Sequence, residues 1–244
     1  MFKVIVFSLF LTIFAQSNTI TFKSLDGLKI TADLYVVDKN YSKPFILLFH
    51  QAGWSRGEYK EIAPKLNKLG FNVMAVDLRS GGEINGVVNQ THQEALFEEK
   101  STSYLDSIQD IEASINYAKE NYAKGKLIIW GSSYSASLVI YVASKSSNLI
   151  DGVVAFSPGE YFKKYGKSND FIKNSAKNLK VPIFIASANK EYKIWENIYK
   201  SIESKKSFFI PKSGGVHGSR NLWSRFKTSK QYWSAVEKFL KEYK

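Results

Sequence analysis

The sequence of residues 127–144 is LIIWGSSYSASLVIYVAS. It opens with four apolar residues, as does a strand buried on both faces of a sheet. It closes with small and apolar residues that favour a helix. The segment GSSYS, residues 131–135, joins the two and predicts a sharp strand-to-helix turn. Such a turn lifts the side chain at its tip, here Ser133, out of the sheet and exposes the hydroxyl group.

The two positions that flank the tip at a distance of two residues must be small, because strand and helix crowd together there. The first is Gly131 and the second is Ser135, where glycine is more usual. Serine is also small, so this departure weakens the pattern without breaking it. Taken by itself, the segment also fits a serine-rich helix N-cap that has no chemical role.

Strands and helices alternate on both sides of this turn. Residues 45–49 and 152–156 are continuous apolar runs that predict buried strands. Residues 104–121 carry apolar side chains at helical spacing. The alternation predicts an α/β protein with a mostly parallel sheet and helices on both faces. Residues 19–22 and 28–37 predict an antiparallel pair of strands at the start, and the pattern continues without a break that would indicate a second domain.

The charge of the chain is strongly positive but rests mainly on lysine. The 244 residues carry a formal net charge of +12. Arginine occurs only at positions 56, 79, 220 and 225. Nucleic-acid-binding proteins usually cluster their positive charge and use arginine to contact bases. We therefore expect a solvated lysine-rich surface and no nucleic-acid partner. The chain has no cysteine, so we expect neither disulfides nor thiol chemistry.

The first residues have the order of features found in a signal peptide. Lys3 provides a positive charge, residues 4–14 are apolar, and residues 15–17 (AQS) place small residues at a cleavage site. The apolar run is too short to cross a bilayer, which takes roughly 20 residues. We predict a signal peptide over residues 1–17 and one domain over residues 18–244. The protein is then exported, to the periplasm or the medium, without a stable membrane span after cleavage.

The histidines argue against a metal site. The chain has three, His50, His92 and His217, and no two of them have the spacing of metal ligands. His50 ends a predicted strand, and His92 lies in a polar stretch. His217 lies in the glycine-flanked segment GGVHG, residues 214–218, after the last predicted strand. We expect no metal ion.

Several of these segments resemble the α/β-hydrolases, and dienelactone-hydrolase-like esterases most of all. Residues 45–53 (FILLFHQAG) resemble the family's strand that ends in the oxyanion loop, and residues 76–82 (VDLRSGG) its next strand-end turn. The Ser133-Tyr134 pair resembles prolyl-oligopeptidase-type hydrolases. The resemblance covers nearly all of the chain after residue 17. It implies the α/β-hydrolase fold, with a mostly parallel twisted sheet.

The resemblance also implies which residues carry the chemistry. Ser133 would be the nucleophile and His217 its general base. The family places an acid after the strand that corresponds to residues 181–186, most often at the position of Lys190. Glu191 is the carboxylate within reach, with Asn189 as an uncharged alternative. The candidate donors of the oxyanion hole are the backbone N–H groups of Tyr134 and Ala52, with Gln51 as the alternative to Ala52.

The implied activity is cleavage of a small-molecule ester or lactone through an acyl-enzyme intermediate, without an organic cofactor. Two alternatives remain open. One is a peptidase that uses the same three residues, and the other is a binding protein that keeps the fold but has lost activity. Asp77 and Arg79 form a charged pair near the predicted site, and the resemblance favours a structural role for them in bracing loops.

Overall fold

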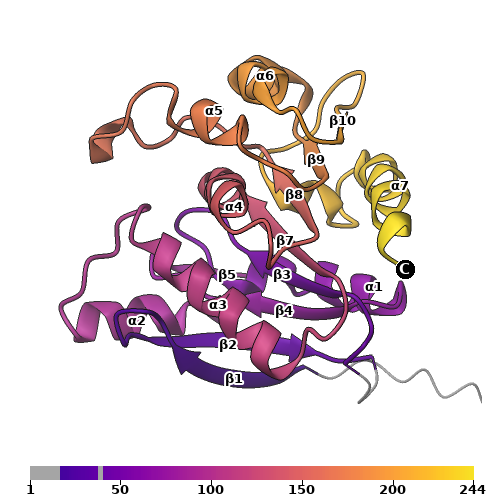
Figure 1. Cartoon of the computed structure of the whole chain (residues 1–244). Coiled ribbons are helices and arrows are strands. Elements are labelled where there is room, and N and C mark those ends of the chain that lie inside the picture. The colour runs from indigo at the N-terminus through magenta and orange to yellow at the C-terminus, as the bar shows by residue number, and fades with distance from the viewer. Residues whose placement is uncertain (1–16, 38–40) are drawn as a thin grey trace, which may run out of the picture.

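The computed structural model describes residues 17–37 and 41–244. Within this part of the chain, one sheet contains eight strands in the order β1-β2-β4-β3-β7-β8-β9-β10 (Figure 1). Six strands of this sheet are mutually parallel: β4, β3, β7, β8, β9 and β10. Strands β1 and β2 run antiparallel to their neighbours. The predicted α/β-hydrolase fold, with a mostly parallel sheet and an antiparallel opening pair, is confirmed.

The bounds of the strands are β1 (Asn18–Lys23), β2 (Lys29–Tyr35), β3 (Phe45–Phe49), β4 (Asn72–Val76), β5 (Glu83–Ile84), β6 (Val87–Val88), β7 (Leu127–Ser132), β8 (Gly152–Phe156), β9 (Ile183–Ala186) and β10 (Lys206–Phe209). The bounds of the α-helices are α1 (Ile62–Lys68), α2 (Gln90–Phe97), α3 (Ser107–Asn121), α4 (Tyr134–Lys145), α5 (Phe171–Ala176), α6 (Tyr192–Ser201) and α7 (Ser229–Leu240). The 3₁₀ turns are η1 (Arg56–Tyr59), η2 (Lys163–Tyr165), η3 (Asn189–Glu191), η4 (Ser219–Leu222) and η5 (Lys241–Tyr243).

The two faces of the sheet are both buried, because alternate residues of each central strand enter different hydrophobic clusters. On β3, Leu47 packs on the face covered by α3, α4, α5 and α6. Its neighbours Ile46 and Leu48 pack on the face covered by α1 and α7. Such two-sided burial explains why the central strands are continuous apolar runs rather than alternating ones. Because these central strands are parallel, their carboxyl ends lie along one edge of the sheet.

The segment after β4 differs most from the sequence-based prediction. Helix α2 and the β5–β6 hairpin were not predicted. The predicted signal peptide lies outside the described residues except for Ser17. Among the described helices, none has both the length and the apolar character needed to span a membrane.

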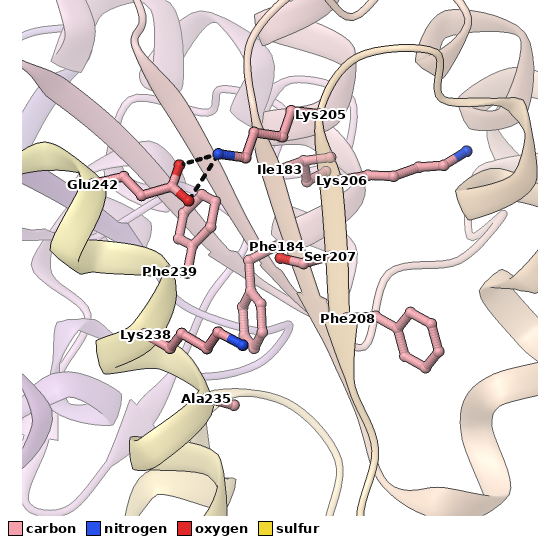
Figure 2. Close-up of a pocket in the computed structure, with 10 residues that line it drawn as sticks. All are labelled: Ile183, Phe184, Lys205, Lys206, Ser207, Phe208, Ala235, Lys238, Phe239 and Glu242. Atoms are coloured by element: carbon pink, nitrogen blue, oxygen red, sulfur yellow. Dashed lines mark hydrogen bonds and ion pairs between the residues drawn. The ribbon is translucent and has the colours of Figure 1, made fainter.

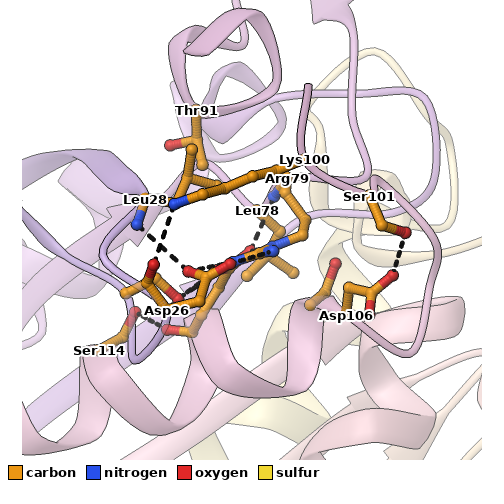
Figure 3. A network of polar contacts seen from close by, with 12 residues as sticks. Asp26, Leu28, Leu78, Arg79, Thr91, Lys100, Ser101, Asp106 and Ser114 are labelled. Atoms are coloured by element: carbon orange, nitrogen blue, oxygen red, sulfur yellow. Dashed lines mark hydrogen bonds and ion pairs between the residues drawn. The ribbon is translucent and has the colours of Figure 1, made fainter. Parts of the chain in front are cut away.

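Arg79 is the centre of a buried polar network that joins the β1–β2 turn, the segment after β4 and α3 (Figure 3). Its guanidinium donates to Asp110 at 2.8 Å and to Asp26 at 2.9 Å. Arg79 and Asp110 are buried, with 1% and 0% of their surface exposed. The expected Asp77–Arg79 pair is wrong, since Asp77 pairs with Arg56 at 2.6 Å. Both ion pairs brace loops, as the structural interpretation held.

Replacing Asp110 by alanine should destabilise the protein strongly. The change leaves the buried Arg79 guanidinium without its main partner, and breaking a buried pair in this way costs about 3–5 kcal/mol. Urea unfolding monitored by tryptophan fluorescence measures the loss. The matched control is Lys126→Ala, which breaks the exposed pair with Asp151 and should leave the midpoint nearly unchanged. Equal midpoints for the two variants would contradict a stabilising role for the network.

Candidate active site

Ser133 stands at the tip of the turn between β7 and α4. Its backbone has φ 61° and ψ −121°, in a region that residues other than glycine rarely adopt. Such a conformation costs about 1–3 kcal/mol and persists where the surrounding structure enforces it. The close packing also explains Gly131, because a Cβ atom there would lie 2.3 Å from the carbonyl oxygen of Ser135. The predicted strand-to-helix turn is therefore present.

Ser135, which replaces the usual glycine, takes part in holding this turn. Its hydroxyl oxygen accepts the backbone N–H of Ser132 at 2.8 Å. The same hydroxyl lies 2.8 Å from the carbonyl oxygen of Phe49 at the end of β3. Ser135 thus links the turn to the neighbouring strand, and the departure from glycine leaves the geometry intact.

Three side chains from separate strand ends form a continuous hydrogen-bonded chain. The Oγ of Ser133 lies 2.7 Å from Nε2 of His217, whose Nδ1 lies 2.6 Å from Oε1 of Glu191. His217 comes from the loop after β10, and Glu191 ends η3, directly after β9. These distances are those of a nucleophile, a base and an orienting carboxylate.

The carboxylate of Glu191 is held at its second oxygen as well. Oε2 accepts the hydroxyl of Ser157 at 2.6 Å and the backbone N–H of Ala188 at 3.3 Å. Burial opposes ionisation of Glu191, but hydrogen bonds from His217 and Ser157 outweigh it and lower the pKa of this carboxyl. Glu191 is therefore charged at neutral pH. Asn189, the uncharged alternative, faces away and donates to the carbonyl oxygens of Pro211 and Lys212.

The candidate oxyanion donors can be distinguished by their backbone partners. The N–H of Gln51 donates to Oε2 of Glu58 at 2.8 Å, so it is already in use. Among the hydrogen bonds of the described residues, the N–H groups of Ala52 and Tyr134 have no protein acceptor. Tyr134 directly follows the nucleophile candidate and begins α4, whose dipole also favours negative charge there. Ala52 and Tyr134 are thus the available pair.

His50 secures the loop that carries Ala52. Its Nε2 accepts the backbone N–H of Leu78 at 2.9 Å, so its Nδ1 carries the proton and donates to the carbonyl oxygen of Gln51 at 2.8 Å. Complete burial lowers the pKa of His50 to about 4, which keeps the ring neutral. In the described part of the chain, no three His, Asp or Glu side chains are grouped as metal ligands would be.

Two residues of the site were missed by the sequence analysis. Ser157 bridges Glu191 and the backbone N–H of Gly218, at 2.6 and 3.0 Å. It has φ 55° and directly follows β8. That position was a usable signal, because residues after parallel strands gather at one edge of the sheet. Glu58 is buried behind the oxyanion loop, and nothing in its local sequence distinguishes it.

A separate pocket lies at the other end of the sheet (Figure 2). Its volume is about 200 Å³, and its lining comes from β9, β10 and α7, with a Lys205–Glu242 ion pair at the rim. Ile183 and Lys206, which line it, begin their strands, whereas the Ser133 site lies where the strands end. This pocket therefore has no part in the chemistry of Ser133.

Structural comparison shows the same fold in several hydrolases. An esterase from Pyrococcus furiosus has a TM-score of 0.72 at 19% identity, with 93% of each chain covered. A dienelactone hydrolase from Anabaena variabilis has a TM-score of 0.71 at 14% identity, with 93% of this chain and 98% of that chain covered. An acylaminoacyl peptidase from Pyrococcus horikoshii has a TM-score of 0.66 at 15% identity, and the match covers only 41% of its chain.

Sequence comparison gives the family. No functionally curated protein matches the chain significantly. The model of the dienelactone hydrolase family matches residues 31–207, well over half of the sequence. This range contains the candidate nucleophile Ser133 and the candidate acid Glu191. The chain belongs to the dienelactone hydrolase family and is a hydrolase that acts on ester bonds.

Proposed function

We propose that the protein cleaves a carboxylic ester or lactone of a small molecule by way of an acyl-enzyme on Ser133. The observation that carries the proposal is the unbroken hydrogen-bonded chain from Ser133 through His217 to Glu191. A chain of this kind activates a hydroxyl that is otherwise a weak nucleophile. Its assembly from three distant parts of the sequence argues against a fold kept only for binding.

The first half of the reaction acylates the serine. Oγ of Ser133 attacks the carbonyl carbon while Nε2 of His217 takes the hydroxyl proton. The negative charge moves to the carbonyl oxygen, where the N–H groups of Ala52 and Tyr134 stabilise it. The positive charge on His217 is stabilised by Glu191. The alcohol then leaves with the proton from His217. In a lactone, this alcohol stays attached to the acyl group.

The second half repeats these steps with water as the nucleophile. His217 takes a proton from water, the hydroxide adds to the acyl carbon, and the same two N–H groups hold the oxyanion. Collapse of the intermediate releases the acid and returns the proton to Ser133. Every proton transfer in both halves uses His217.

The experiment that tests the proposal compares simple ester substrates with the amide substrates of a peptidase. We expect 4-nitrophenyl acetate and butyrate to be hydrolysed with kcat/KM at least about a hundredfold above that of aminoacyl 4-nitroanilides. Esters have the better leaving group, and a peptidase site needs further contacts to the peptide. Release of nitrophenol or nitroaniline measures both. Equal or faster cleavage of the anilides would support the peptidase alternative, and no turnover of any ester would contradict the proposal.

A further inference from the structure

Glu58 is a buried carboxyl group that the proposed reaction does not use. It lies in η1, with none of its surface exposed. The nearest arginine in sequence, Arg56, turns away and pairs with Asp33 and Asp77. A buried carboxylate without a cationic partner is costly unless several donors satisfy it. Its contacts therefore indicate what it holds in place.

The contacts of Glu58 join three loops of the site. Oε2 accepts the backbone N–H of Gln51, the residue before Ala52, at 2.8 Å. Oε1 accepts the hydroxyl of Ser132, the residue before Ser133, at 2.7 Å. The oxygen of Ser132 in turn accepts the backbone N–H of Ser219, two residues after His217, at 2.9 Å. Ala52, Ser133 and His217 each lie one or two residues from a group that Glu58 contacts directly or through Ser132.

We propose that the carboxylate of Glu58 is a positioning residue, which holds the oxyanion loop, the nucleophile turn and the histidine loop in their reactive arrangement. It acts through Gln51 and Ser132 and touches neither the substrate nor the reacting atoms. The proposal rests on the proposed function of Ser133. By holding the N–H of Gln51, Glu58 fixes the peptide that precedes Ala52 and leaves the Ala52 donor free for the oxyanion.

The ionised form of Glu58 accepts all of these contacts as they stand. Both of its oxygens face donors, and Nε2 of Gln51 also lies 3.5 Å from Oε1. A proton on Oε2 would face the backbone N–H of Gln51, and a proton on Oε1 would make the Ser132 hydroxyl turn and accept. The titratable groups that act on it are His217, from the histidine loop, and the hydroxyl of Tyr59, next in η1. Burial raises the pKa of Glu58 to about 7, against the opposing hydrogen bonds from Ser132 and Gln51. The carboxylate therefore forms as the pH rises through neutrality.

The test compares wild type with Glu58→Gln between pH 5.5 and 9. The readouts are the second-order rate of labelling by a fluorophosphonate and kcat for 4-nitrophenyl acetate. Below about pH 6 both proteins have a neutral group at position 58, and their rates should agree within about twofold. Above pH 8 the wild type should be about tenfold faster or more, as expected for loss of groups that orient a site. The ratio of the two rates should rise through about pH 7.

The control is Glu61→Gln, which removes an exposed carboxylate three residues away and should follow wild type at every pH. A second variant, Ser132→Ala, removes one donor from the carboxylate. With one donor fewer to the carboxylate, its rate should rise with pH along a curve displaced to higher pH. This variant tests the inference even if Glu58→Gln does not fold. A ratio of wild-type to Glu58→Gln rates that is constant across pH would overturn this inference but not the proposed function. A wild type that is not labelled at any pH would overturn the proposed function, and this inference with it.

Discussion

Replacing Ser133 by alanine is expected to lower kcat for nitrophenyl esters by about 10⁴- to 10⁶-fold and to abolish labelling by a fluorophosphonate. The change removes the atom on which the proposed acyl-enzyme forms. What remains is binding and the oxyanion donors, which account for the residual rate seen when a nucleophile of this kind is deleted. Alanine keeps the Cβ atom, so the positive φ of position 133 is no more strained than before.

The matched control for this variant is Ser144→Ala, in the last turn of α4. Among residues 17–37 and 41–244, its hydroxyl bonds only to the carbonyl oxygen of Tyr141, and the variant should keep wild-type turnover. Labelling is measured by in-gel fluorescence and intact mass, which also gives the stoichiometry. If Ser133→Ala were still labelled with one probe per chain, another nucleophile would be responsible, and the assignment of Ser133 would be wrong.

Replacing Glu191 by glutamine should reduce kcat by about 10³- to 10⁴-fold, with KM nearly unchanged. The amide has the same shape, but it carries no charge to stabilise the imidazolium that forms at His217. One side of the amide is also a donor, facing either Nδ1 of His217 or the hydroxyl of Ser157. Both effects act in the transition state rather than on substrate binding, and therefore appear in kcat.

The same substitution at Glu196 is the control for Glu191→Gln. Glu196 lies one turn further along, in α6, and pairs with Lys193 and Lys200 at the surface. Its replacement should leave kcat unchanged. Steady-state kinetics on one nitrophenyl ester measures both variants. A Glu191→Gln protein that retained more than a tenth of the wild-type rate would show that a different group orients His217.

The sheet could be predicted from the sequence because its central strands are buried on both faces. The apolar runs at residues 45–49, 127–130 and 152–156 can be recognised without knowing which strands pair with them. Helix α2 could not be predicted in this way, since only Thr91 and Ala95 of its eight residues are buried. A helix with so small an apolar face leaves little periodic signal.

The candidate site was predictable where a local pattern constrains the backbone. Crowding at the turn requires small residues around Ser133, and glycines flank His217 in the sequence. The partners of Arg79 depend instead on the path of the chain, which brings Asp26 and Asp110 to it from 53 and 31 residues away. Glu58 was missed for the same reason, because its contact with Ser132 spans 74 residues. Such contacts are consequences of the strand order and leave no mark in the neighbouring sequence.

The placement of the three reactive side chains also affects when activity appears during folding. Ser133 and His217 are separated by 84 residues, and the strands β8, β9 and β10 between them lie in succession beside β7. Closing contacts between such distant segments is slow relative to forming helices. A nascent or refolding chain can therefore contain most of its helical structure while its serine is still unreactive. The rate at which the fluorophosphonate labels a refolding chain then measures when the last strands pair.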